Sequence, residues 1–254
     1  MSIKFESADG IARITLAAPE RRNSLTPGEF GELRDILATV ARTPSDRAVV
    51  LTGEGTAFCS GAFLPLEGPD VPAITLMRQI NETARALYRL PQPVVAAVNG
   101  HAVGAGMSIA LGCDFVIASS GATFSQVFVK RGLSPDFGSS WLLPRIVGLA
   151  NAKKLALLGD TIGAQEAERL GIVTEVVAPE ELAEAATRLA RRLADGPPIA
   201  IGLAKELLNE AFTSTFDEAL DHEATVAATN MAAEDASEAL AAFKEKRAPA
   251  FKGR

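Results

Sequence analysis

Two segments of the sequence combine glycine with other small residues next to a predicted strand. Residues 57–64 read Ala-Phe-Cys-Ser-Gly-Ala-Phe-Leu and follow a β-branched run at 48–51, and residues 98–106 lead from a second run into an apolar helix. Small side chains let backbone N–H groups approach a ligand closely, and the N–H groups at a helix start lack partners within the helix. Such groups could bind an anionic oxygen. The alternative for both segments is a turn whose small residues serve only tight packing.

A third segment, residues 131–138, adds a carboxyl group to the glycine pattern. It reads Arg-Gly-Leu-Ser-Pro-Asp-Phe-Gly and leads into another predicted helix. Asp136 could act as a general acid and base. An aspartate in this position could equally cap the helix that follows it. The residue pattern by itself leaves both roles open.

The cysteines and histidines are too few for several other kinds of site. The sequence has two cysteines, Cys59 and Cys113, and two histidines, His101 and His222. These numbers do not supply a disulfide framework or a Cys- or His-rich metal site. We expect both cysteines to pack as small apolar residues, and both histidines to be non-catalytic.

The composition is that of a globular protein with a sizeable core. The chain has 254 residues, of which 48% are apolar and 22% charged, and its net charge is −6. An acidic balance argues against non-specific nucleic-acid binding but is compatible with small anionic ligands. The first ten residues lack an apolar signal core, and the most apolar stretch, residues 102–118, is too short and too interrupted by glycines to span a bilayer. We expect a cytoplasmic protein that binds neither membrane nor nucleic acid.

Strands alternate with helices over most of the chain, which predicts an α/β fold with a largely parallel sheet. A hairpin is predicted at residues 3–16, and an N-cap followed by proline at 26–29 begins the first helix. From residue 180 onward the pattern is helical. We therefore expect an α/β core at residues 1–195 and a C-terminal helical region at residues 196–254. The other predicted elements are strands at 48–51, 93–98, 115–118 and 173–177 and helices at about 74–90 and from 104.

Taken together, five motifs in the same order resemble those of the enoyl-CoA hydratase/isomerase (crotonase) family. The matching positions are Pro19, Asn23 and Leu25, the small-residue stretch 57–64, the Asn-Gly-rich stretch 99–106, the Leu-Ser-Pro-Asp-Phe-Gly stretch 133–138, and the C-terminal stretch 243–251. The resemblance covers nearly the whole chain, and the order of the motifs makes it specific. It implies a crotonase-like ββα spiral, followed by a C-terminal helical region that forms trimers.

The resemblance also implies a site for a coenzyme A thioester. Carried over by position, the backbone N–H groups of Ala62 and Ala105 form an oxyanion hole that stabilises the enolate of the thioester. A homotrimer or a dimer of trimers is expected. Coenzyme A enters as part of the substrate, and no metal or redox cofactor is implied. The expected coenzyme A contacts are Arg21, Arg22, Ser60, Gly61, Phe63, Leu64, Gly104 and Gly106, with Phe243 and Lys246 reaching the ligand from a neighbouring subunit.

Two departures from the family pattern indicate the expected reaction. Hydratases of the family carry two glutamates where this sequence has Ser108 and Phe128. Asp136 lies where certain isomerases of the family, including the ring-opening isomerases of phenylacetate degradation, place an acid. A single carboxyl suits a proton shuttle, and burial beside Phe63, Phe128 and Phe137 would raise its pKa. We therefore predict an enoyl-CoA double-bond isomerase with Asp136 as the acid and base.

Three alternatives compete with this prediction. The chain could be a hydratase if another acid such as Glu82 entered the site, or an acyl-CoA-binding member with weak or no catalysis. A dehydrogenase is disfavoured, because the glycine-rich turn at 100–106 begins far into the chain and Tyr88 is not followed by lysine four positions later. Phe63, at a position that is usually aspartate in the family, could line the acyl pocket or simply pack.

Overall fold

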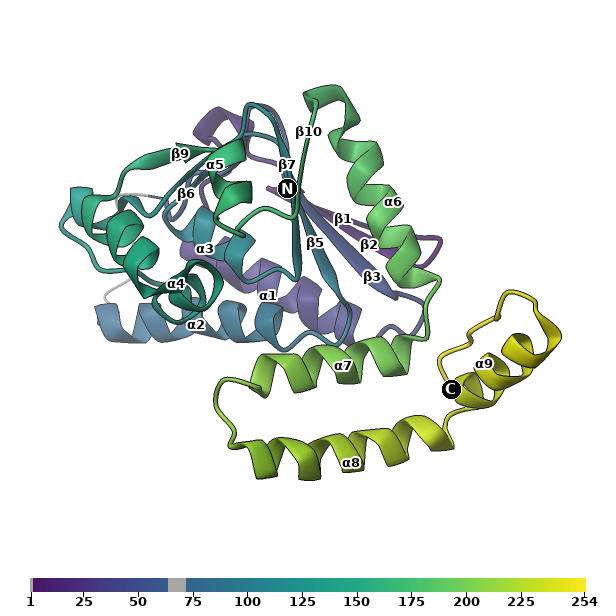
Figure 1. The fold of residues 1–254 in the computed structure, drawn as a ribbon. Coiled ribbons are helices and arrows are strands. Elements are labelled where there is room, and N and C mark those ends of the chain that lie inside the picture. Colours follow the sequence, from purple (N-terminus) through teal and green to yellow (C-terminus); the bar gives the residue numbers. More distant parts are fainter. Residues whose placement is uncertain (1, 64–71) are drawn as a thin grey trace.

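The computed structural model describes residues 2–63 and 72–254, which form two β-sheets and the helices that cover them (Figure 1). The chain opens with β1 (Ile3–Ala8), which pairs antiparallel with β2 (Ile11–Leu16). Asp9 and Gly10 form the turn with positive φ angles of 54° and 79°. Asp-Gly is favoured in such two-residue hairpin turns. The predicted hairpin is therefore confirmed.

The larger sheet has six strands in the order β1-β2-β3-β5-β7-β10. Its other strands are β3 (Ala48–Gly53), β5 (Val94–Val98), β7 (Phe115–Ser119) and β10 (Glu175–Val177). The helices that cover it are α1 (Pro27–Ala41), α2 (Ala73–Tyr88) and α6 (Leu182–Ala194). From β2 onward neighbouring strands are parallel, and every residue of β5 is buried. Parallel sheets are buried in this way because helices cover both faces: α6 packs on one face and α1 and α2 on the other.

The smaller sheet gives the fold its repeat. Its strands are β4 (Ala57–Cys59), β6 (His101–Val103), β8 (Thr123–Ser125) and β9 (Thr161–Gly163). The next helices are α3 (Ala105–Leu111), α4 (Ser139–Leu158) and α5 (Ala164–Arg169), and short 3-10 helices are η1 (Pro19–Arg21), η2 (Val127–Arg131) and η3 (Pro179–Glu181). Three times, a strand of the larger sheet is followed by a strand of the smaller sheet and then by a helix: β3-β4-α2, β5-β6-α3 and β7-β8-α4. This order confirms the predicted spiral of ββα turns.

Two glycines permit the close crossing from one sheet to the other. A Cβ on Gly53 would lie 2.2 Å from the Ala57 carbonyl oxygen, and a Cβ on Gly100 would lie 2.0 Å from the Thr56 carbonyl oxygen. Both distances are far inside van der Waals contact, so only glycine fits without a shift of the backbone. The strands of the smaller sheet can therefore begin close to the ends of β3 and β5.

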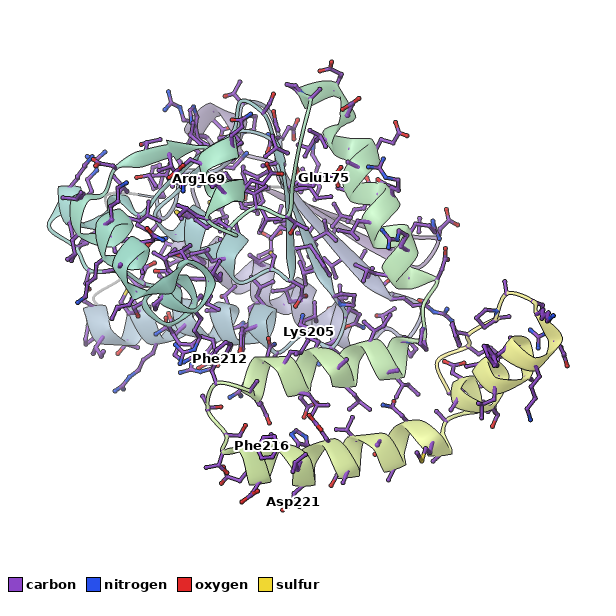
Figure 2. The ribbon with its side chains drawn as sticks, viewed as in Figure 1. Arg169, Glu175, Lys205, Phe212, Phe216 and Asp221 are labelled. Carbon is purple, nitrogen blue, oxygen red and sulfur yellow. The ribbon has the colours of Figure 1, made fainter. Side chains whose placement is uncertain are left out.

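The C-terminal helices extend away from the core as an arm (Figure 1). The arm consists of α7 (Pro198–Glu210), α8 (Phe216–Ala232) and α9 (Glu234–Glu245). Large apolar side chains of the arm are exposed, including Phe212 and Phe216, which are labelled in Figure 2. The predicted boundary at residue 196 falls just before α7, and the division into two units stays a prediction. In the described part of the chain, no helix has the length and apolarity needed to cross a membrane.

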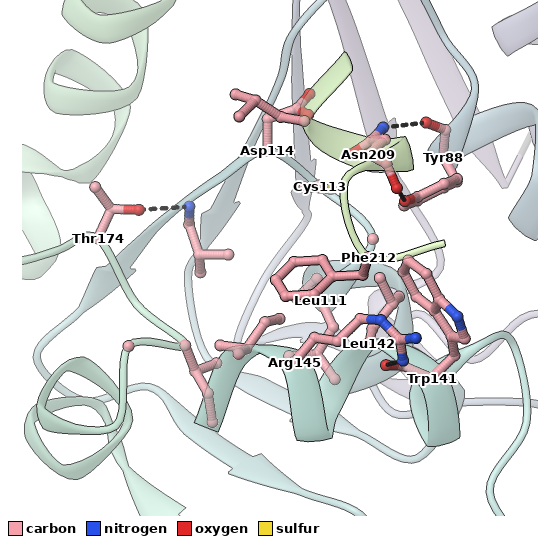
Figure 3. A pocket seen from close by; sticks show the side chains of 17 residues that line it. Tyr88, Leu111, Cys113, Asp114, Trp141, Leu142, Arg145, Thr174, Asn209 and Phe212 are labelled. Carbon is pink, nitrogen blue, oxygen red and sulfur yellow. Dashed lines mark hydrogen bonds between the residues drawn. The ribbon is translucent and has the colours of Figure 1, made fainter. Parts of the chain in front are cut away.

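Contacts of α7 and the turn after it hold the arm to the core. Lys205 Nζ on α7 lies 2.7 Å from Asp114 Oδ2. Next to this ion pair is a cavity of about 290 Å³ (Figure 3). There the Arg145 guanidinium lies 3.7 Å from the centre of the Trp141 ring and 5.7 Å from that of Phe212. Cations over aromatic faces attract the ring electrostatically, so Arg145 joins the start of α4 to the turn that follows α7.

Candidate functional site

A cavity of about 980 Å³ lies where the three glycine-bearing segments of the sequence meet. Its walls come from the loop after β4, from the start of α3 and from the segment between η2 and α4, and α2 contributes a further side. The predicted site residues that line it are Arg21, Arg22, Ser60, Gly61, Ala62, Phe63, Gly104, Ala105 and Asp136. The fold therefore brings most of the predicted site together around one cavity.

Three predicted site residues do not line this cavity, and a fourth cannot be placed. Gly106 is buried inside α3, and Leu64 lies outside the described residues. Phe243 and Lys246 are exposed at the end of α9 on the arm, away from the cavity of their own chain (Figure 1). Their contact with the ligand of a neighbouring subunit stays a prediction.

Two backbone N–H groups at the cavity have no acceptor among the described residues. Ala62 forms a parallel bridge with Leu25, in which the Leu25 N–H donates to the Gly61 carbonyl oxygen and the Phe63 N–H donates to that of Leu25, both at 2.9 Å. This pairing does not use the Ala62 N–H. Ala105 is the first residue of α3, so its N–H has no carbonyl one turn earlier in the helix. Within residues 2–63 and 72–254, neither N–H group donates a hydrogen bond.

Glycines bring these two N–H groups close to each other. A Cβ on Gly61 would lie 3.4 Å from the Ala105 nitrogen and 2.9 Å from the Val103 carbonyl oxygen, and Gly61 has a φ of 103°. A Cβ on Gly106 would lie 2.0 Å from the Cys59 carbonyl oxygen. The loop after β4 and the start of α3 therefore pack backbone against backbone. This arrangement can hold two donors toward one oxygen, which is the geometry of an oxyanion hole.

Asp136 presents to the same cavity a carboxyl that pairs with no described residue. Its Oδ1 atom is buried and has no hydrogen-bond partner among the described residues. Burial raises the pKa of Asp136 from its ordinary value of 3.8 to about 6, because removal from water disfavours the charged form. Gly138 is the N-cap of α4, and no side chain caps that helix. The alternative role of Asp136 as a helix cap is therefore wrong.

The two positions that hold glutamates in family hydratases have no acid here. The Ser108 side chain is fully buried and donates to the Gly104 carbonyl oxygen at 3.1 Å. Phe128 is 6% exposed, and its ring faces Gly104. Glu82 lies exposed on α2, pairs with Arg85 at 2.6 Å and does not line the cavity. Among the described cavity residues, Asp136 is therefore the one carboxyl group.

Four arginines line the cavity and differ in their partners. Arg21 Nη1 donates to Glu29 Oε2 at 2.9 Å, and its other terminal nitrogen donates to the second carboxylate oxygen. Burial opposes ionisation of Glu29, but hydrogen bonds led by that from Arg21 outweigh it and lower its pKa to about 2. Arg85 pairs with an acid on its own helix. Arg22 and Arg131 form no ion pair with any described residue, so they are the cations available to a phosphate.

Several cavity residues were not predicted from the sequence. On α2 they are Met77, Ile80, Asn81, Ala84 and Arg85. This spacing of three and four residues marks one helix face, which the sequence does display. The pattern could not show that this face meets a cavity instead of the core. Arg131, Ser134 and Ser140 are further cavity residues within or next to the third segment.

No group of three or more metal-binding side chains occurs in the part of the chain that the structure describes. Its described cavity residues offer instead two backbone donors, one carboxyl and two guanidinium groups, of Arg22 and Arg131, that form no ion pair with any described residue. This set can stabilise negative charge on an oxygen, move a proton and bind an anionic ligand.

Comparison with known proteins gives one consistent result. A family model described as "Enoyl-CoA hydratase/isomerase" matches residues 6–254. The chain is 41% identical to the 1,2-epoxyphenylacetyl-CoA isomerase of Escherichia coli K12 over 251 residues, which cover 96% of each protein. It is 34% identical to the short-chain-enoyl-CoA hydratase of Clostridium acetobutylicum, over 97% of this chain and 95% of the relative. A crystal structure of an enoyl-CoA hydratase from Bacillus anthracis superposes with a TM-score of 0.94 at 35% identity, with each chain covered completely.

Proposed function

Because the chain belongs to the enoyl-CoA hydratase/isomerase family, we propose that it shifts the double bond of an enoyl-CoA thioester, with Asp136 as the acid and base. The observation that carries this proposal is the lone Asp136 carboxyl in the described cavity, with Oδ1 buried and unpartnered. A base whose pKa is about 6 is largely ionised at neutral pH and is still a competent acid once protonated.

The proposed reaction is a proton transfer from one carbon to another. The ionised Asp136 removes a proton from Cα of a 3-enoyl thioester, and the C–H electron pair moves into a dienolate. The negative charge rests on the thioester oxygen, where the N–H groups of Ala62 and Ala105 donate to it. Protonated Asp136, whose proton can exchange with solvent, then delivers a proton to Cγ, and the double bond ends between Cα and Cβ. No water is added, and the carboxyl returns to its initial state.

Hydration requires more acids than the described residues of this cavity offer. One acid must activate water while another handles the proton at Cα, and the positions of those acids hold Ser108 and Phe128. Phe128 also places an apolar ring beside Gly104 at the oxyanion loop. The apolar wall disfavours an ordered water there. These features support isomerisation over hydration.

A second substrate is an epoxide of a phenylacetyl-CoA thioester. The similarity to the 1,2-epoxyphenylacetyl-CoA isomerase extends over 96% of both proteins. Phe63, Phe128 and Phe137 line the cavity, and aromatic rings pack well against a ring-derived acyl group. Isomerisation of this epoxide would use the same oxyanion hole.

We further propose that the arm assembles a homotrimer or a dimer of trimers, in which Phe243 and Lys246 reach a neighbouring site. The exposed apolar side chains of the arm support this, since large exposed apolar surfaces mark association sites. Phe216 is 77% exposed and Phe243 is 84% exposed. The molar mass in solution, measured by light scattering for wild type and Phe216→Asp, tests it. A monomeric wild-type protein would refute the proposal.

The test of catalysis is solvent-deuterium exchange with a 3-enoyl-CoA and a 2-enoyl-CoA thioester. We expect deuterium at Cα and Cγ together with double-bond migration in the wild type, and loss of both in Asp136→Asn with thioester binding retained. Glu82→Gln is the matched control, because it neutralises an exposed acid on a cavity helix, and it should exchange like the wild type. Formation of 3-hydroxyacyl-CoA, or undiminished exchange in Asp136→Asn, would overturn the assignment. Turnover of the phenylacetyl-CoA epoxide without enoyl isomerisation would favour the second substrate.

A further inference from the structure

The residue after Asp136 has an unusual backbone conformation. Phe137 has a φ of 52°, in the left-handed region, and Gly138 follows with a φ of 81°. The other non-glycine residues at positive φ in the described chain are Asp9, Arg22, Asn23 and Lys246. All of these are polar, whereas Phe137 is aromatic. For a bulky residue this conformation is strained and needs compensation from its surroundings.

The compensation comes from the burial of the Phe137 ring. Its side chain is 2% exposed and belongs to the main hydrophobic core. The ring centre lies 5.9 Å from that of Phe30 on α1, with the planes tilted by 39°. Phe30 is itself fixed, because the Thr83 hydroxyl on α2 donates to its carbonyl oxygen at 2.8 Å. The Phe137 ring is therefore packed between the cavity and helices α1 and α2, in surroundings that hold it firmly.

The other end of the segment is held by hydrogen bonds to the backbone of Asp136. Both the N–H and the hydroxyl of Ser139 donate to the Asp136 carbonyl oxygen, at 3.0 and 2.9 Å. The Asp136 carboxyl has no comparable contact, since Oδ1 lacks any partner among the described residues. No described contact of its own therefore orients the Asp136 carboxyl, and its direction depends on the conformation of the Asp136 backbone. Phe137 and Ser139 hold that backbone in place.

From this arrangement we infer that Phe137 is a positioning residue: its buried ring holds the backbone in the left-handed conformation that points the Asp136 carboxyl into the cavity. The inference rests on the proposed function for the role of Asp136 in catalysis. The placement of the carboxyl can be measured without turnover. Phe137 acts on Asp136 through the covalent geometry of the backbone and through its own core packing, and contacts no reacting atom of the substrate in this role.

A competing explanation is that Phe137 only forms part of the cavity wall, which it does line. A wall residue would affect how the acyl group binds, and so change KM. A positioning residue would change kcat and the protonation of Asp136, because a freed carboxyl gains water and its pKa falls toward 3.8. The two roles are therefore separated by the split between kcat and KM, and by the titration of Asp136 when the support of the Phe137 ring is weakened while the ring itself stays in the cavity wall.

The experiment compares four variants with the wild type. Phe137→Gly removes the ring but accepts a positive φ without strain, and Phe137→Leu is the conservative variant that keeps an apolar buried side chain. Phe30→Leu weakens the same ring contact from the opposite side and serves if Phe137→Gly fails to fold. Phe124→Leu is the control, because Phe124 is fully buried in β8 and does not line the cavity. The measurements are the pH titration of the Asp136 ¹³Cγ resonance, assigned with Asp136→Asn, and the kinetics of double-bond migration.

In the wild type the Asp136 resonance should titrate near pH 6. In Phe137→Gly we expect a midpoint lower by about one unit or more and a kcat lower by about 100-fold with little change in KM. Phe137→Leu should recover a large part of both, and Phe124→Leu should match the wild type. An unchanged titration in Phe137→Gly, or the same loss in Phe124→Leu, would overturn the inference. A normal Asp136 titration in a wild type without isomerase activity would instead refute the proposed function alone.

Discussion

Neutralising Asp136 should stabilise the fold while it removes the activity. Burial raises the pKa of this carboxyl from 3.8 to about 6. Because the folded-state pKa lies above the unfolded-state value, protonated Asp136 favours the folded state below about pH 4, and this contribution is lost as the pH rises through 6. Above that pH the fold holds a carboxylate that would be more stable in water. Asp136→Asn removes that charge.

The size of the effect follows from the two pKa values. A pKa shift of one unit corresponds to about 1.4 kcal/mol. Relative to low pH, the raised pKa of Asp136 therefore lowers the free energy of unfolding by roughly 3 kcal/mol at pH 8 and by about half of that at pH 5. Urea denaturation at the two pH values measures this difference. Trp141 is the one tryptophan in the sequence, and its contact with Arg145 makes its fluorescence a probe of unfolding. All samples need one protein concentration, because assembly also contributes to apparent stability.

The informative quantity is the change with pH, because an asparagine amide also alters the neutral packing. We expect the stability gain of Asp136→Asn to be about 1.5 kcal/mol larger at pH 8 than at pH 5. Asp136→Ala should show the same pH-dependent part, and Glu82→Gln, on an exposed acid, should show almost none. A gain that is equal at the two pH values would refute the conclusion that burial without a partner raises this pKa.

Three further substitutions test other parts of the structure. Gly61→Ala should lower kcat by about 100-fold or more, because its Cβ would lie 2.9 Å from the Val103 carbonyl oxygen and displace an oxyanion donor; steady-state kinetics measure this. Arg21→Met should lower the free energy of unfolding by roughly 3 kcal/mol at pH 7. Glu29 has a lowered pKa, so this loss should be present above about pH 4.5 and shrink as the pH falls toward 2; urea denaturation across that range tests it. Lys205→Met removes an ion pair of α7 and should lower the melting temperature, and an unchanged value would show that packing alone holds the arm.

Local patterns allowed the larger sheet to be predicted. The Asp9-Gly10 turn, the Thr26 capping box and the apolar runs of β3, β5 and β7 each contain their signal within a few neighbouring residues. The smaller sheet was missed because β4, β6, β8 and β9 have three residues each. Such strands are too short to show alternation. Their existence depends on the tight crossing at Gly53 and Gly100, which is a contact between distant segments.

The candidate site, like the fold, has parts that the sequence predicts and parts that it does not. The loops that line the cavity have distinct glycine patterns, so they could be found from the sequence. The cavity face of α2, including Asn81 and Arg85, has the periodicity of an ordinary core helix and could not be told apart from one. The positive φ of Phe137 had no local signal at all. The ring contact that accompanies it comes from Phe30 on α1, far away in the sequence, so only the assembled fold reveals it.

The separation of charges in the cavity explains how an anionic ligand and a carboxyl with a raised pKa can share one site. Arg22 and Arg131 are exposed, whereas Ala105 is 2% exposed. A guanidinium close to Asp136 would lower its pKa, yet burial is the cause that acts on it. Backbone N–H groups carry no net charge, so they can stabilise the enolate oxygen without a full positive charge beside the acid. Cations at the exposed part of the cavity can bind phosphates, and neutral donors in its buried part leave Asp136 basic enough to take a proton.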